Sequence, residues 1–150
     1  MGLLDGKKGL IMGVANDHSI GWGIAQALHA EGAELGFNFL GEALDRRVRP
    51  LAESLGAKLI EPCNVQSDEE IDVFIARVRE VYGSLDIIVH SIAFANRDEL
   101  NGPYLKTTRA GFLQALEISA YSLTAIVKAI QTVQYLIRDP FGTAGTGTGS

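Results

Sequence analysis

The stretch Gly9-Leu-Ile-Met-Gly13 decides the fold, because it is a short apolar run that ends in glycine and leads into the polar loop Val14-Ala-Asn-Asp-His-Ser19. A helical pattern follows from Ile20 to Glu31, and Gly32 stands where a helix end often needs a left-handed residue. Strand, glycine loop and helix in this order are typical of the first unit of a parallel α/β sheet.

The rest of the sequence repeats this alternation. We expect further strands at residues 33–39, 58–65 and 85–90, and further helices at about 42–55, 67–82 and 109–137. Pro50 should kink or split its helix, and Pro62 should end regular strand pairing. Ser67 and Glu70 have capping-box spacing, and the nearly all-apolar strand 85–90 should be covered on both faces. The pattern predicts an α/β fold with a Rossmann-like, doubly wound parallel sheet, truncated after about four strands.

Composition sets limits on the class of protein. The chain has 150 residues, of which 47% are hydrophobic and 21% charged, with a formal net charge of −5. These values exclude a disordered chain and argue against nucleic-acid or anionic-membrane partners. Cys63 is the only cysteine, and neither a signal peptide nor a run of about 18 uninterrupted apolar residues is recognised, so we expect a soluble cytoplasmic protein. We expect residues 1–138 to form an incomplete nucleotide-binding domain and the Gly/Thr-rich residues 139–150 a flexible tail.

In a doubly wound sheet a ligand binds outside the carboxyl ends of the strands, where the strand order reverses. Four segments should meet there: Gly13–Ile20, Leu40, Cys63–Val65 and Ser91–Ala93. Gly13 would permit a sharp turn, the N–H groups of the next helix would attract a pyrophosphate, Ser19 could add a hydroxyl, and Gly23 would let the helix approach the sheet. Taken alone, Gly13 and Gly23 could be a turn glycine and a packing glycine, but the strand–loop–helix context favours nucleotide binding.

Four motifs together resemble one known family. They are Gly13-x5-Ser19-Ile20-x2-Gly23, Cys63-Asn64-Val65, His90-Ser91-Ile92-Ala93-Phe94-Ala95 and Ile118-Ser119-Ala120-Tyr121-Ser122. In order, they resemble the bacterial NADH-dependent enoyl-acyl-carrier-protein reductases, a divergent branch of the short-chain dehydrogenases, over about residues 4–137. The resemblance implies reduction of 2-enoyl thioesters carried on acyl carrier protein in fatty acid biosynthesis, and a homo-oligomer.

The resemblance also implies roles for individual residues. The cofactor NADH would contact Gly13, Val14, Ala15, Ser19, Ile20, Asn64, Val65, Ser91, Ile92, Ala93 and Ile118, and the acyl substrate would lie near Phe94, Ala95 and Leu100.

Three features depart from the family pattern. Asn64 replaces an aspartate that is common in relatives. Leu40 replaces a glutamine at the end of the second strand, where no acidic residue is available to bind the ribose 2′-hydroxyl of NADH. With Arg46 and Arg47 close by in the sequence, NADPH stays open as the cofactor. The family's catalytic tyrosine and lysine follow a fifth strand that this sequence does not contain. Tyr121 and Lys128 stand seven residues apart in an earlier helix, where they are expected to be non-catalytic. We therefore assign no catalytic residue and expect the chain to be inactive alone.

Two alternatives stay open: a non-catalytic nucleotide-binding or interaction module derived from a short-chain dehydrogenase, and a short-chain dehydrogenase that acts on a carbonyl. Among single residues, Cys63 is expected to be a small buried side chain and Trp22 a packing residue. His18 and His90 are too far apart to suggest a metal site, so none is expected.

Overall fold

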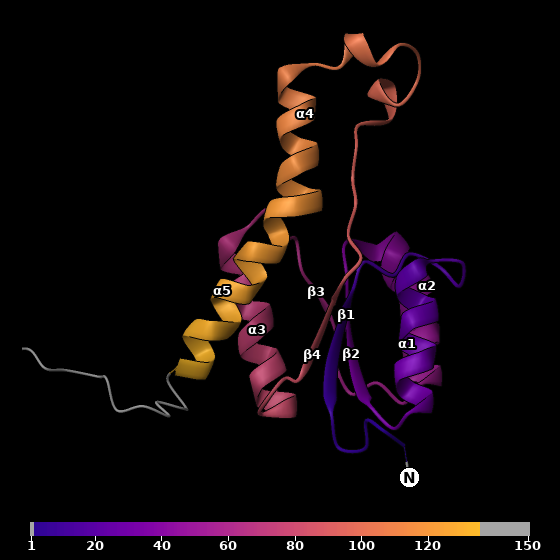
Figure 1. The fold of residues 1–150 in the computed structure, drawn as a ribbon, viewed down its shortest axis with the longest axis vertical. Coiled ribbons are helices and arrows are strands. Elements are labelled where there is room, and N and C mark those ends of the chain that lie inside the picture. Colours follow the sequence, from indigo (N-terminus) through magenta and orange to yellow (C-terminus); the bar gives the residue numbers. More distant parts are fainter. Residues whose placement is uncertain (1, 136–150) are drawn as a thin grey trace, which may run out of the picture.

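The computed structural model describes residues 2–135, which form a four-stranded parallel sheet with helices on both faces (Figure 1). The first seven elements alternate: β1 (Lys8–Met12), α1 (Ile20–Ala30), β2 (Glu34–Phe39), α2 (Glu42–Ser54), β3 (Ile60–Pro62), α3 (Asp68–Tyr82) and β4 (Ile87–His90). The expected fold class and element order are confirmed. The expected tail at 139–150, and the last two residues of the helix expected to end at 137, lie outside the described residues.

The strand order is β3-β2-β1-β4. The chain therefore moves outward in one direction from β1 through β2 to β3, and then crosses back over β1 to place β4 on its other side. This reversal puts the point where a ligand is expected between the carboxyl ends of β1 and β4. Ser91 N–H donates to Met12 C=O at 2.8 Å, so the two strands stay paired up to that point.

Two apolar layers hold the helices to the sheet because successive side chains of a strand point to opposite faces. Ile11 faces the layer under α1 and α2, where Trp22 packs against Phe37 with ring centroids 6.4 Å apart. Leu10 and Met12 face the layer under α3 and α5. Trp22 is therefore a packing residue, as expected.

Two details of the expected helices are tested directly. The Ser67 hydroxyl accepts from Glu70 N–H at 3.2 Å, which confirms the cap of α3. Pro50 does not split α2, which runs unbroken from Glu42 to Ser54. Val48 and Ala52, one on each side of the exposed Pro50, are both fully buried and hold both parts of the helix on the sheet.

The outer strands differ from expectation. β3 has three residues instead of eight, although it does end at Pro62. All four residues of β4 are only half-buried, because β4 is an edge strand within the described part of the chain, paired with β1 alone. The expected cover on both faces is therefore incomplete there.

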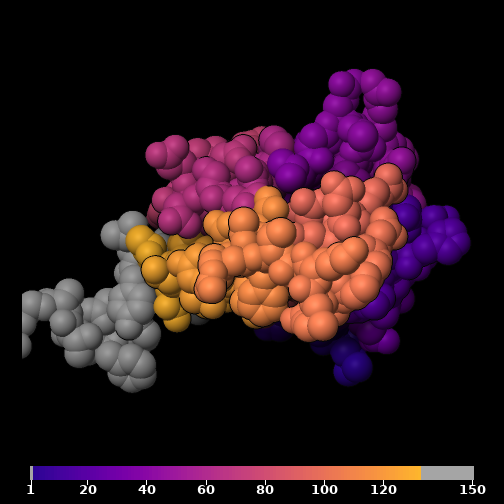
Figure 2. Space-filling view, turned by 90° about the horizontal axis from the view of Figure 1, so that it is seen from above, coloured from indigo at the N-terminus to yellow at the C-terminus, as the bar shows by residue number. Residues whose placement is uncertain are grey.

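After β4 the chain rises away from the sheet and returns as one long helical run (Figure 1). The rising segment holds two 3₁₀ turns, η1 (Arg97–Glu99) and η2 (Tyr104–Lys106), and the return consists of α4 (Arg109–Leu116), a π-helical turn η3 (Glu117–Tyr121) and α5 (Ser122–Tyr135). Seen from above, the orange residues of this segment form the near surface of the molecule (Figure 2). Thr108 caps α4 by accepting from Gly111 N–H at 3.0 Å.

The returning helix is unusually apolar. Arg109–Thr132 has the length and composition of a membrane-spanning helix, with a mean hydropathy of 1.3 over 18 residues, of which 22% are buried. Part of this apolar surface is used within the fold, because Ala125, Ile126 and Ala129 belong to the core against α3.

Candidate functional site

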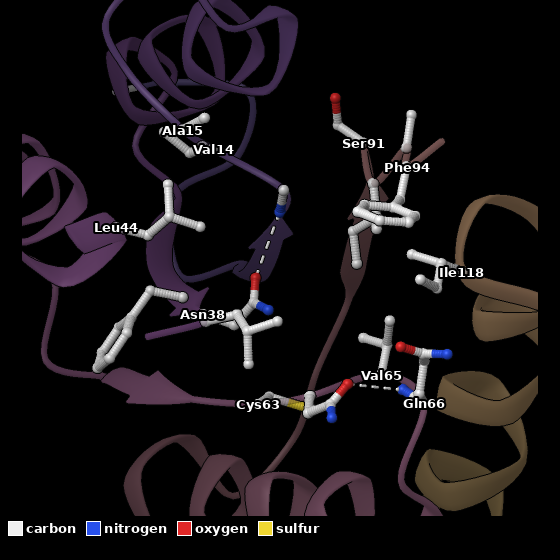
Figure 3. Close-up of a pocket in the computed structure, with 16 residues that line it drawn as sticks. Val14, Ala15, Asn38, Leu44, Cys63, Val65, Gln66, Ser91, Phe94 and Ile118 are labelled. Carbon is white, nitrogen blue, oxygen red and sulfur yellow. Dashed lines mark hydrogen bonds between the residues drawn. The ribbon is translucent and has the colours of Figure 1, made fainter. Parts of the chain in front are cut away.

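A pocket of about 390 Å³ opens at the carboxyl ends of the strands (Figure 3). All four segments that the sequence placed at this edge contribute to its wall, which is lined by Gly13, Val14, Ala15, Asn38, Phe39, Leu40, Leu44, Cys63, Asn64, Val65, Gln66, Ser91, Ile92, Ala93, Phe94 and Ile118. Every candidate cofactor residue except Ser19 and Ile20 is in this wall. Of the candidate substrate residues, only Phe94 is.

Gly13 forms the junction between two strand ends. Its φ of +101° suits glycine, and a methyl group built on it would overlap the backbone of Ser91 and lie 2.8 Å from Ile92 N. The backbones of β1 and β4 therefore approach each other at this point more closely than any side chain would permit.

Asn38 fixes Gly13 from the other side, a role that its place in the sequence did not predict. Its Oδ1 accepts from Gly13 N–H at 3.3 Å, and the residue is 6% exposed (Figure 3). A buried amide must find a partner, and here the partner is the turn itself. The only available signal was one amide among the apolar residues of strand 33–39.

The loop after Gly13 is folded by Ser19. The Ser19 hydroxyl accepts from Ala15 N–H at 3.0 Å and from Asn16 N–H at 3.1 Å, so it closes the loop instead of facing the pocket. Within residues 2–135, no acceptor is found for the N–H groups of Ile20 and Gly21 at the start of α1. The first turn of α1 also has no acidic residue, so its N-terminus keeps a partial positive charge available to an anion.

Gly21, and not Gly23, is the glycine that lets α1 approach the sheet. A methyl group on Gly21 would lie 3.3 Å from Ser91 Cβ and 3.4 Å from Val14 Cγ2, whereas one on Gly23 would meet nothing within 4 Å. The expectation for Gly23 is therefore wrong. Two residues along a helix turn the side chain by about 200°, which places Gly23 on the solvent side.

The end of β3 supplies amide groups. Asn64 Oδ1 accepts from Gln66 N–H at 3.1 Å, which leaves the amide nitrogen of this lining residue as a donor. Gln66 in turn donates to Glu117 Oε2 at 3.1 Å. Cys63 is 2% exposed, and burial, with a smaller effect of Glu70, raises its pKa to about 12. Its thiol therefore stays protonated, as suits a small buried side chain rather than a nucleophile.

The end of β4 forms the opposite wall. Ser91, Ile92, Ala93 and Phe94 all line it. Ile118 reaches the same wall from the π-helical turn, and Figure 3 shows it near Phe94. Ala95 and Leu100 lie outside the wall, and Leu100 is 69% exposed on the loop between η1 and η2.

No lining residue carries a charge. Two arginines of α2 are paired with acidic residues of their own helix: Arg46 with Glu42, and Arg49 with Asp45 at 2.8 Å. Arg49 also lies over the ring of Phe39, 5.7 Å from its centroid. A phosphate in this pocket would therefore depend on backbone N–H groups and on the N-terminus of α1.

Tyr121 and Lys128 lie elsewhere. They line a separate groove of about 190 Å³ with Asp68 and Asp72 of α3, and this groove shares no lining residue with the main pocket. Among the residues that the structure describes, no three His, Cys, Asp or Glu side chains are grouped as potential metal ligands.

Comparison with known proteins shows consistent similarity. Residues 13–141 match the family model described as enoyl-(acyl carrier protein) reductase. The chain is 48% identical over 127 residues to enoyl-[acyl-carrier-protein] reductase [NADH] 2 of Rhizobium meliloti, covering 85% of this chain and 47% of that protein.

Solved structures agree. The enoyl-(acyl-carrier-protein) reductase of Anaplasma phagocytophilum in complex with NAD is 46% identical, with a TM-score of 0.82, covering 87% of this chain and 50% of that one. The Bacillus cereus enoyl-acyl carrier protein reductase with NADP⁺ and an indole naphthyridinone is 47% identical, with a TM-score of 0.83, covering 89% of this chain and 52% of that one. The chain thus spans about half the length of the relatives it matches.

Proposed function

Because the chain belongs to the enoyl-(acyl carrier protein) reductase family, we propose that its pocket binds NADH and that it forms the cofactor-binding part of an enzyme reducing 2-enoyl thioesters carried on acyl carrier protein. The observation that supports this most strongly is the convergence of four strand ends on an uncharged cavity with Gly13 and the N-terminus of α1 beside it. The family and the structural relatives favour an enoyl substrate over the carbonyl alternative.

The residues divide between the two ends of an extended dinucleotide. Asn64 and Val65 would contact the adenine, and the Asn64 amide nitrogen can donate to a ring nitrogen. Gly13, Val14 and Ala15 would follow the pyrophosphate, with the free N–H groups of Ile20 and Gly21 at its side. Ser19 would act indirectly by shaping this loop.

Ser91, Ile92, Ala93 and Ile118 would contact the ribose and nicotinamide, and Phe94, Ala95 and Leu100 would border the acyl chain. Bound NADH supplies the hydride for the reduction. The apolar wall made by Ile92, Phe94 and Ile118 would keep water away from the ring face and orient it.

A polypeptide of these 150 residues contains no tyrosine followed seven residues later by lysine outside the helix that carries Tyr121 and Lys128. We expect it to bind NADH without reducing a crotonyl thioester. Titration followed by NADH fluorescence, with turnover measured at 340 nm, tests both statements. Saturable binding without turnover supports the proposal. Absence of binding contradicts the proposal and favours the interaction-module alternative. That alternative is supported by β4, which has one unpaired edge within residues 2–135.

We also propose that the protein is cytoplasmic and self-associates. Five large apolar side chains on one helical run are more than 40% exposed: Phe112, Leu113, Leu116, Tyr121 and Leu123. Exposed apolar surface of this kind is typical of an interface. Light scattering after size-exclusion chromatography should give a mass at least twice 16.1 kDa, and a monomer at micromolar concentration would contradict self-association.

A further inference from the structure

The π-helical turn Glu117–Tyr121 interrupts the long helix beside the pocket. A π turn adds a residue to the ordinary helical repeat and so rotates the remainder of the helix by about 100°. Here it directs three neighbouring side chains toward β4 and its continuation. Ile118 reaches the pocket wall, Ser119 reaches Phe94, and Ser122 reaches His90.

Ser122 attaches the helix to the sheet. It is fully buried, its hydroxyl donates to Ile118 C=O at 2.7 Å, and its oxygen lies 2.7 Å from His90 Nε2. Because the hydroxyl proton is already used, His90 must be the donor in the second bond. These contacts fix the position of the π turn along the direction of β4, next to His90.

Ser119 holds the segment that follows β4. Its hydroxyl accepts from Phe94 N–H at 3.0 Å and donates to Phe94 C=O at 3.2 Å. One side chain thereby satisfies both the backbone N–H and the backbone C=O of Phe94. Phe94 has no neighbouring strand in the described chain, so its backbone position depends on this hydroxyl.

We propose that Ser119 is a positioning residue that sets the nicotinamide end of the pocket through Phe94, without affecting the adenine end. This inference rests on the proposed binding of NADH. Its basis is that Ser119 bonds only the wall that follows β4, through Phe94. Gly13 is held by Asn38, and Asn64 by the backbone N–H of Gln66; the link from this end to the π turn runs through the Gln66 side chain and Glu117, and does not involve Ser119.

The test compares two ligands that differ only in the nicotinamide, NADH and ADP-ribose, on the 150-residue chain. Ser119→Ala removes both hydrogen bonds to the Phe94 backbone; it should raise the Kd for NADH by about five- to tenfold and leave the Kd for ADP-ribose unchanged. Ser119→Cys, which nearly keeps the shape but donates weakly, should change the Kd in the same direction. Thr132→Ala is the matched control, because it removes another hydroxyl bonded to the same long helix and should change neither Kd.

Hydrogen exchange provides a readout that a general loss of stability would not produce. The Phe94 amide should exchange faster in Ser119→Ala, while the amide of Ser91, bonded to Met12, should keep its protection. An unchanged Kd for NADH, or an equal rise for both ligands, would overturn the proposal. If the unmodified chain binds ADP-ribose as tightly as NADH, the positioning role is wrong while nucleotide binding stands. If it binds neither, the proposed function itself fails.

Discussion

Gly13→Ala tests the central contact of the pocket. The added methyl group would overlap the Ser91 backbone and lie 2.8 Å from Ile92 N, where an ordinary contact needs about 3.5 Å. The ends of β1 and β4 must therefore separate by about 1 Å. That movement would break the 2.8 Å bond from Ser91 N–H to Met12 C=O and the 3.3 Å bond from Gly13 N–H to Asn38.

The expected cost has two parts. Each lost hydrogen bond costs about 1 kcal/mol, and a φ of +101° with a side chain adds about 1–2 kcal/mol. Gly13→Ala should therefore lower the free energy of unfolding by about 3–4 kcal/mol, which for a urea slope of about 2 kcal/mol/M moves the midpoint by about 1.5–2 M. It should also abolish measurable NADH binding.

Two glycines separate the contributions. Gly56 has φ +68° with nothing within 4 Å of an added methyl group, so Gly56→Ala carries the conformational cost alone, about 1–2 kcal/mol. Gly23→Ala has neither strain nor clash and should be neutral or stabilising by up to about 1 kcal/mol. If Gly13→Ala unfolds at the same urea concentration as Gly56→Ala and still binds NADH, the close approach of β1 to β4 is not what shapes the pocket.

Three further outcomes are expected. Leu40→Arg places a cation at the end of β2, where Leu40 is 54% exposed. It should lower the Kd for NADPH by about tenfold and change the Kd for NADH little, as measured by fluorescence titration with Leu40→Ala as the control. Equal changes in both Kd values would contradict the assignment of this position to the ribose 2′ group. Burial lowers the pKa of His90 in the folded chain. As the pH falls below about 6.5, the unfolded chain binds this proton before the folded chain does. The free energy of unfolding should therefore decrease between pH 6.5 and the lowered pKa. Urea unfolding at pH 7.5 and 5.5 should show a larger loss for the unmodified chain than for His90→Gln, and equal losses would remove His90 as the cause. Cys63, with a pKa raised to about 12, should not react with a thiol reagent at pH 7.5 until urea unfolds the chain; rapid labelling of the folded chain would show that the end of β3 is open.

Residue patterns were sufficient for the sheet and for the position of the pocket. Apolar runs separated by helical segments predict parallel strands, and parallel strands bring their carboxyl ends to one edge, so Gly13, Asn64 and Ser91 could be placed together from their positions in the sequence. The structure brings them into one wall.

The directions of side chains could not be predicted in the same way. Whether Gly21 or Gly23 faces the sheet depends on the rotation of α1, which follows from packing of Trp22 and Ala25 and not from spacing alone. From the sequence, the Ser19 hydroxyl could have faced either a ligand or its own loop. In the structure it faces the loop, because the N–H groups of Ala15 and Asn16 donate to it. The π turn at Glu117–Tyr121 could not be predicted from the sequence either, because the helical repeat of apolar residues continues through it.

The strand order has a consequence for how the molecule folds. β1 pairs with β2 through residues 26 positions apart, Lys8 with Glu34, whereas Gly9 pairs with Ile87, 78 positions along the chain. Closing the longer loop costs about 1 kcal/mol more in chain entropy, so β4 is expected to dock late. The two walls of the pocket thus belong to parts of the chain that meet last. A nucleotide that contacts both walls binds only after β4 has docked, so it stabilises the docked state. At a concentration one hundred times its Kd it would raise the free energy of unfolding by about 2.7 kcal/mol.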